Sequence, residues 1–146
     1  MVDTSHLNTG TSDSAVDMKI GILIVDECSD FVERHIVVLL DMLRSMGCTD
    51  GDIVVKQIPS ISDTVMGVQF FAEYTDVDGV VIVMPQEKLF AFQALLGGIV
   101  HLQMQWNMPV AIGGADKAVD IVRMIILQTD MEASAPDNQA ERHVVN

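Results

Sequence analysis

Residues 19–47 read KIGILIVDECSDFVERHIVVLLDMLRSMG, in which a short apolar run precedes a longer segment with helical spacing. The run over 20–25 is almost uniformly apolar and β-branched, which is typical of a strand covered on both faces of a parallel sheet. The longer segment has apolar residues at the spacing of one helix stripe. This stripe consists of Val32, Ile36, Leu39, Leu43 and Met46. Gly47 follows it in the position where helices commonly end.

The same alternation of short and long apolar segments continues along the chain. Further β-branched runs are IVVKQI (53–58), GVVIVM (79–84) and PVAIGG (109–114). Segments with helical spacing lie between and after them, at 63–75, 86–106 and 115–128. Such alternation implies right-handed crossovers with helices on both sheet faces. We therefore expect residues 18–128 to form an α/β domain with a four-stranded parallel sheet in the order 2-1-3-4.

Both ends of the chain differ in composition from this domain. Residues 1–17 and 129–146 are rich in small and polar side chains, so flexible tails are expected. The N-terminal residues lack the basic start and apolar run of a signal peptide. The run LFAFQALLGGIV (89–100) is too short for a membrane span, which needs about 20 apolar residues. We expect a cytoplasmic protein without a membrane partner.

The net charge limits the partners that the chain can be expected to bind, and the cysteines indicate its redox environment. The chain of 146 residues is 49% apolar, enough for one folded core, and has a formal net charge of -13. This charge repels phosphate backbones, so nucleic acid is not expected as a partner. Cys28 and Cys48 lack CxxC spacing, which indicates free thiols in a reducing compartment. Cys28 as a nucleophile is the less common alternative, because such thiols are mostly structural.

Any site is expected in the loops after the strands, because ligands of parallel sheets bind beyond the strands' carboxyl ends. Gly113-Gly114 before a helix could admit an anion, although a tight turn is the commoner reason for two glycines. Asp26 and Glu27 could bind Mg²⁺, but acidic residues near a helix start are usually just exposed. The four histidines show no metal-ligand spacing, so no metal site is expected.

Two segments resemble a response-regulator receiver domain. They are ILIVDE (22–27), which precedes a helix, and DGVVIVMP (78–85). A receiver needs a phosphoacceptor aspartate at the end of its third strand, where this chain has Val81, Ile82 and Val83. A degenerate receiver-like signalling domain is therefore one alternative.

A longer resemblance covers most of residues 19–128 and is to the lumazine synthase family with its archaeal riboflavin synthase relatives. KIGILIVDECSDFVERHIVVLLDML (19–43) is similar to the family's first strand and helix. SMGCTDGDIVVKQIPSISDTV (45–65) is similar to its second strand and the following VPG-type loop. FFAEYTDVDGVVIVMP (70–85) and MPVAIGG (108–114) are similar to its third and fourth strands, so four segments match in order.

This resemblance implies a flavodoxin-like three-layer sandwich and a role in riboflavin biosynthesis. A 6,7-dimethyl-8-ribityllumazine synthase is a transferase that condenses a ribitylamino-pyrimidinedione with a four-carbon ketose phosphate, without a cofactor. The archaeal relatives dismutate the lumazine product to riboflavin. The family's site loops correspond here to Asp26, Glu27, Cys28, Ser60, Ile61, Ser62, Pro85, Gln86 and Ile112, the expected substrate-binding residues.

The catalytic groups of the family are not matched in this sequence. The loop after the third strand lacks the family's RGxTxH pattern with its acid/base histidine, and no arginine is in register with its phosphate-binding arginine. Lys88 and His101 are the candidates to replace them, because the reaction needs proton transfer and a cation for the phosphate. A non-catalytic homologue that holds a flavin or lumazine, or only assembles, is the other alternative.

The segment 89–106 predicts self-association. Its apolar side chains go well around the expected helix, whereas a helix that covers a sheet needs only one stripe about 100° wide. In the family resembled, the corresponding helix lines the axis of a pentamer, and pentamers sometimes form icosahedral shells. We therefore expect a homo-oligomer, a pentamer or a larger shell, with Phe92, Ile99 and Trp106 partly buried by neighbouring subunits.

Overall fold

A computed structural model describes residues 14–90 and 93–134 of the chain. The strands are β1 (Ile20–Val25), β2 (Ile53–Ile58), β3 (Gly79–Val83) and β4 (Val110–Gly113). The helices are α1 (Ser29–Ser45), α2 (Thr64–Tyr74), α3 (Gln86–Phe90), α4 (Gln93–Trp106) and α5 (Lys117–Ser134). Single 3-10 turns, η3 (Asp26–Cys28), η4 (Asp50–Asp52) and η5 (Ile61–Asp63), lie in the connections.

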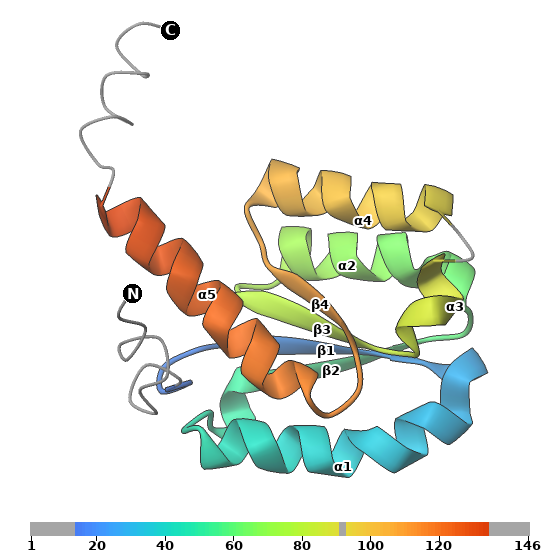
Figure 1. Cartoon of the computed structure of the whole chain (residues 1–146), viewed down its shortest axis with the longest axis horizontal. Helices are drawn as coiled ribbons and strands as arrows, with labels where there is room; N and C mark the ends of the chain where they lie inside the picture. The colour runs from blue at the N-terminus through green and yellow to red at the C-terminus, as the bar shows by residue number, and fades with distance from the viewer. Residues whose placement is uncertain (1–13, 91–92, 135–146) are drawn as a thin grey trace, which may run out of the picture.

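The four strands form one parallel sheet in the order β2-β1-β3-β4. Ile20 at the start of β1 pairs with Ile53 on one side and with Gly79 on the other. Helices α1 and α5 cover one face of the sheet, and α2 and α4 cover the other (Figure 1). The predicted α/β class, with its flavodoxin-like sheet order and three layers, is confirmed.

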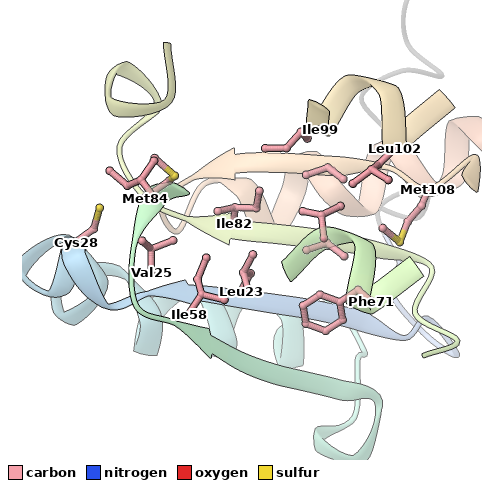
Figure 2. Packing of buried hydrophobic residues seen from close by; sticks show 14 residues of the cluster. Leu23, Val25, Cys28, Ile58, Phe71, Ile82, Met84, Ile99, Leu102 and Met108 are labelled. Atoms are coloured by element: carbon pink, nitrogen blue, oxygen red, sulfur yellow. The ribbon is translucent and has the colours of Figure 1, made fainter. Parts of the chain in front are cut away.

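Each face of the sheet has its own hydrophobic core, because successive side chains of a strand point to opposite faces. Leu23 and Val25 of β1 belong to the cluster under α2 and α4, which Figure 2 shows, whereas Ile20 and Ile22 belong to the cluster under α1 and α5. All four are fully buried. The ring of Phe71 fills the space above Gly21, where a Cβ would lie 2.8 Å from its edge.

The stripe predicted for the first helix is the one that α1 buries. Val32, Leu39 and Leu43 are buried, and Ile36 and Met46 pack partly buried against the same cluster. The chain leaves the helix at Gly47, whose φ of +107° favours glycine and whose N–H donates to Arg44 O at 3.0 Å. Both expectations are confirmed.

The segment predicted as one helix over 86–106 contains α3 and α4, which run in different directions in Figure 1. Ile99 of α4 was expected to contact neighbouring subunits, but it is only 1% exposed and packs in the core of its own chain. The reason is that α4 lies directly against α2, with Gly98 allowing a close approach to Val65. Phe92 lies outside the described residues. Trp106 is exposed.

The predicted domain bounds at 18 and 128 fall inside described structure. Ala15 is fully buried, and its N–H donates to Met46 O at 2.8 Å. Helix α5 continues six residues beyond 128, to Ser134, and its residues over 129–134 are exposed. Four of these six residues are polar, so composition alone did not distinguish this helix end from a tail. The remaining parts of the predicted tails, 1–13 and 135–146, lie outside the described residues.

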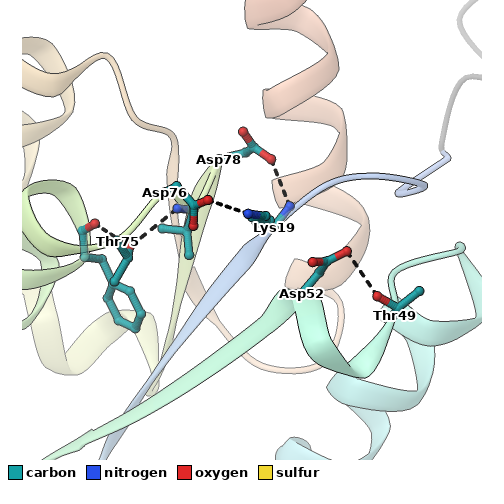
Figure 3. A network of polar contacts seen from close by, with 8 residues as sticks. Lys19, Thr49, Asp52, Thr75, Asp76 and Asp78 are labelled. Atoms are coloured by element: carbon teal, nitrogen blue, oxygen red, sulfur yellow. Dashed lines mark hydrogen bonds and ion pairs between the residues drawn. The ribbon is translucent and has the colours of Figure 1, made fainter.

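The amino edge of the sheet is held by Lys19, the residue before β1 (Figure 3). Its N–H donates to the Asp78 carboxylate at 2.8 Å, and Asp78 N–H donates to Lys19 O at 2.7 Å. The Lys19 ammonium also pairs with Asp76, and this hydrogen bond and charge hold the pKa of Asp76 below its usual value. These contacts tie the loop before β3 to the start of β1. Within the described residues, no helix is long and apolar enough to cross a membrane.

Candidate functional site

The loops after β1 and β2 are joined at the carboxyl edge of the sheet. Glu27 N–H donates to Pro59 O at 3.0 Å, and the Glu27 carboxylate accepts the N–H of Ile61 at 3.1 Å. Ser60 forms a capping box with Asp63, in which Ser60 N–H donates to the Asp63 carboxylate at 3.2 Å. The predicted residues of these two loops are therefore close together. Several of their polar groups, however, are already used in hydrogen bonds within and between the loops.

Cys28 lies where these loops meet the end of β3. It is buried in the cluster that contains Val25, Ile58 and Met84 (Figure 2). Burial raises the pKa of the Cys28 thiol, and the nearby positive charge of Lys88 only partly offsets this. The pKa shift favours the thiol over the thiolate, and the thiolate is the reactive form, so the structure favours a packing role for Cys28.

The other predicted residues lie in two different regions of the structure. Pro85, Gln86 and Lys88 lie at the carboxyl edge, where the side-chain amide of Gln86 donates to Ile112 O at 2.9 Å. His101 is an exposed residue in the second half of α4. Gln103, two residues further on, donates to Val110 O at the start of β4, which is the amino edge of the sheet. The two predicted catalytic residues, Lys88 and His101, are therefore not brought together.

A cleft of about 440 Å³ opens at the carboxyl edge between α1, the start of α3 and the loop from β4 to α5. Its lining residues are Phe31, Arg34, His35, Pro85, Gln86, Glu87, Gly113, Gly114, Asp116 and Lys117. Pro85 and Gln86 were predicted as site residues. The others were not, although Gly113-Gly114 was considered as a place that could admit an anion. This cleft is the candidate binding site.

The aromatic side of the cleft is built by two residues one turn apart on α1. The rings of Phe31 and His35 lie 4.2 Å apart between centroids, tilted by 31°. His35 Nδ1 accepts the N–H of Ala115 at 3.1 Å, so the neutral ring carries its proton on Nε2. A Cβ at position 114 would lie 2.6 Å from His35 Cε1, so the ring packs against a backbone that only glycine provides.

The cations of the cleft have neighbouring acceptors. Arg34 lies over the Phe31 ring, 5.8 Å from its centroid, and its Nε donates to Asp30 O at 3.3 Å. The Lys117 ammonium pairs with Asp120 at 2.8 Å, and this hydrogen bond raises the pKa of Lys117. Its alkyl chain lies over Gly113, whose φ is +153°.

The cleft is suited to binding a ligand that has a planar, polar ring. Aromatic side chains form one side, glycine peptide groups form another, and the charges near the rim are of both signs. Within residues 14–90 and 93–134, no group of three or more His, Cys, Asp or Glu side chains could hold a metal ion. A signal that was missed is the i, i+4 spacing of Phe31 and His35, which puts both rings on one face of the helix that follows β1.

The comparisons with known proteins give no family for the chain. No model of a known protein family matches it, and no curated protein matches it either.

Proposed function

We propose that this chain is a lumazine-synthase-like protein that binds a ribityl-lumazine or flavin in the cleft at the carboxyl edge of its sheet. The observation that carries the proposal is the cleft itself, with Phe31 and His35 beside the glycine peptides of the β4 to α5 loop. Its volume of about 440 Å³ lies within the usual range for small-ligand sites.

The ligand class follows from the chemistry of the walls. A pyrimidinedione ring has a flat face for the aromatic side chains and an edge of alternating donors and acceptors for peptide groups. Offset contacts between aromatic rings contribute about 0.5–1.5 kcal/mol beyond area burial. The proton on His35 Nε2, fixed there by the Ala115 hydrogen bond, gives the cleft one oriented donor.

Binding is better supported than the family's condensation reaction. His35 Nδ1 is occupied by Ala115, and His101 lies toward the amino edge of the sheet. Lys88 is the predicted catalytic residue at the correct edge, near Cys28. The enzymatic alternative, condensation of a ribitylamino-pyrimidinedione with a ketose phosphate, would therefore depend on Lys88 for proton transfer.

The test is a fluorescence titration of the purified chain with 6,7-dimethyl-8-ribityllumazine and with riboflavin. Saturable binding is expected, and His35→Ala should weaken it about tenfold, a loss of about 1.4 kcal/mol. Tyr74→Ala is the matched control, because Tyr74 is an exposed aromatic residue on α2, away from the cleft. If neither ligand binds the native chain, the proposal fails.

Two further variants separate this cleft from the site predicted from the sequence. Ser60→Arg adds a large cation to the loop after β2 and should leave binding unchanged, whereas Gly114→Ala should weaken it. The opposite pattern would move the site to Ser60 and its neighbours. Turnover of the lumazine precursors by the native chain, abolished by Lys88→Ala, would establish the enzymatic alternative instead.

A further inference from the structure

A second hollow, apolar and distinct from the cleft, lies at the amino end of β4. This groove of about 550 Å³ runs between the end of α4 and the second half of α5. It is lined by Gln103, Asn107, Met108, Pro109, Met124, Leu127, Gln128, Met131 and Glu132. Leu127 and Met131, one turn apart on α5, are 60% and 61% exposed. Two large apolar side chains on one helix face are thus left to solvent beside a groove.

The groove has a fixed polar wall. Asn107, with a φ of +53°, follows the last residue of α4 and donates from its side-chain amide to Glu132 at 2.7 Å. The Gln128 amide in turn donates to Asn107 O. These bonds join the end of α4 to α5, so the groove is formed without a partner. In Figure 1 the last turns of α5 extend beyond the sheet.

The adjacent edge of β4 is closed to an added strand. Val80 N–H donates to Pro109 O at 3.0 Å, so in this parallel pair the carbonyls of Val110 and Ile112 face away from β3. These two outward carbonyls accept the side-chain amides of Gln103 at 3.1 Å and Gln86 at 2.9 Å. An added strand would have to displace both amides, so an occupant of the groove contacts it through side chains.

The charges beside the groove select the partner. The exposed charged residues in the last turns of α5 are Asp130 and Glu132, both acidic, and Arg123 lies one turn before Leu127 on the same helix. A second copy docked groove to groove would bring the acidic side chains Asp130 and Glu132 of the two chains together, which is unfavourable. Methionine thioethers, here Met108, Met124 and Met131, adapt to varied apolar surfaces. Together these features describe an acidic, methionine-lined groove.

We propose that this groove binds a basic amphipathic helix of another protein. Leu127 and Met131 contact its apolar face, and Asp130 and Glu132 face its lysines or arginines. This is recognition of a helix in a groove by anchors spaced at one turn. The inference does not depend on the ligand proposed for the cleft, because the two hollows share no lining residue.

The test uses the full chain and a synthetic peptide of lysine and leucine, about 18 residues or five helical turns long, with its leucines on one face. Binding is measured by calorimetry at about 0.15 M salt, where non-specific charge attraction is largely screened. The double variant Leu127→Gln with Met131→Gln should weaken binding about tenfold. The control Val37→Gln with Met66→Gln removes side chains that are each 63% exposed on α1 and α2, and should bind as the native chain does.

Four results would overturn the proposal. Equal binding of a peptide with the same composition in scrambled order would show attraction by charge alone. Equal weakening by both double variants would show that the groove is not the site. A native dimer that the groove variant dissociates, seen by light scattering, would make a second copy the occupant. The variant Val145→Asp makes the C-terminal residues less apolar. If it bound the peptide tenfold more tightly, the chain's own C-terminal residues would be the occupant of the groove.

Discussion

At the residue scale, the account depends on the contact between Gly114 and His35. The two residues are far apart in the chain, yet the His35 ring packs on Gly114 and accepts the N–H of Ala115. Gly114→Ala places a methyl group inside the ring's volume, so it should destabilise the fold by about 1–3 kcal/mol in urea unfolding. His35→Ala should remove part of this penalty, since the clash disappears with the ring.

The matched control for that substitution is Gly51→Ala, because a Cβ at position 51 meets no atom within 4 Å. Its unfolding midpoint should stay close to that of the native chain. If the two alanine variants unfold alike, the ring does not pack on Gly114 and the aromatic side of the cleft is not fixed as described.

The ion pair of Lys19 and Asp76 predicts a pH dependence. The pKa of Asp76 is lower in the folded chain than its ordinary value, because Lys19 donates to the carboxylate and attracts its charge. The pair therefore stabilises the fold above the unfolded pKa of about 3.9, and this stabilisation is lost as pH falls through the folded pKa. Asp76→Asn should lower the unfolding midpoint slightly near pH 7, since both groups are exposed, and make no difference near pH 2. An equal effect at both pH values would contradict the ion-pair account.

At the element scale, the hydrogen bond from Gln103 to the edge of β4 can be tested by unfolding. Gln103→Ala leaves Val110 O without its partner and should cost about 1 kcal/mol in unfolding free energy. It also frees part of the strand edge, so light scattering should show more self-association. Gln105→Ala, an exposed glutamine on the same helix, is the control and should change neither quantity.

The strands were the elements that the sequence predicted best. The runs 20–25 and 53–58 coincide with β1 and β2, and those at 79–84 and 109–114 exceed β3 and β4 by one or two residues. Uniformly apolar, β-branched runs identify buried parallel strands because both faces are covered. The different directions of α3 and α4 and the exposed end of α5 were not predicted, because side-chain composition does not reveal either.

The site was predicted only in part, for a physical reason. The rule that ligands bind at strand ends led to Pro85 and Gln86, and both residues line the candidate cleft. That rule does not predict the contact between His35 and Gly114. The contact depends on how α1 packs against the loop before α5, and the sequence holds no local signal for that packing. His101 was chosen for its chemistry alone, and chemistry does not fix which end of a helix faces the strand ends.

At the scale of the whole molecule, self-association stays a prediction, but the structure changes which residues are available for contacts between subunits. The side chain of Ile99 is buried in the core of its own chain, whereas Val100, Met104 and Trp106 of α4 are exposed. An oligomer formed through α4 should therefore dissociate in the Val100→Gln with Met104→Gln variant, measured by sedimentation. A native chain that sediments as a monomer of 15.9 kDa at micromolar concentration would contradict the prediction.

The central claim is that the cleft at the carboxyl edge holds a lumazine or flavin. The most direct measurement is a ¹H–¹⁵N spectrum of the labelled chain, recorded as 6,7-dimethyl-8-ribityllumazine and then riboflavin are added. The account predicts saturable shifts of the Gly113, Gly114 and Ala115 amides, together with Phe31 and His35 on α1, while Val37 and Tyr74 stay unchanged. Saturable shifts confined to Ser60, Ile61 and Ser62, or no shifts with either ligand, would contradict it.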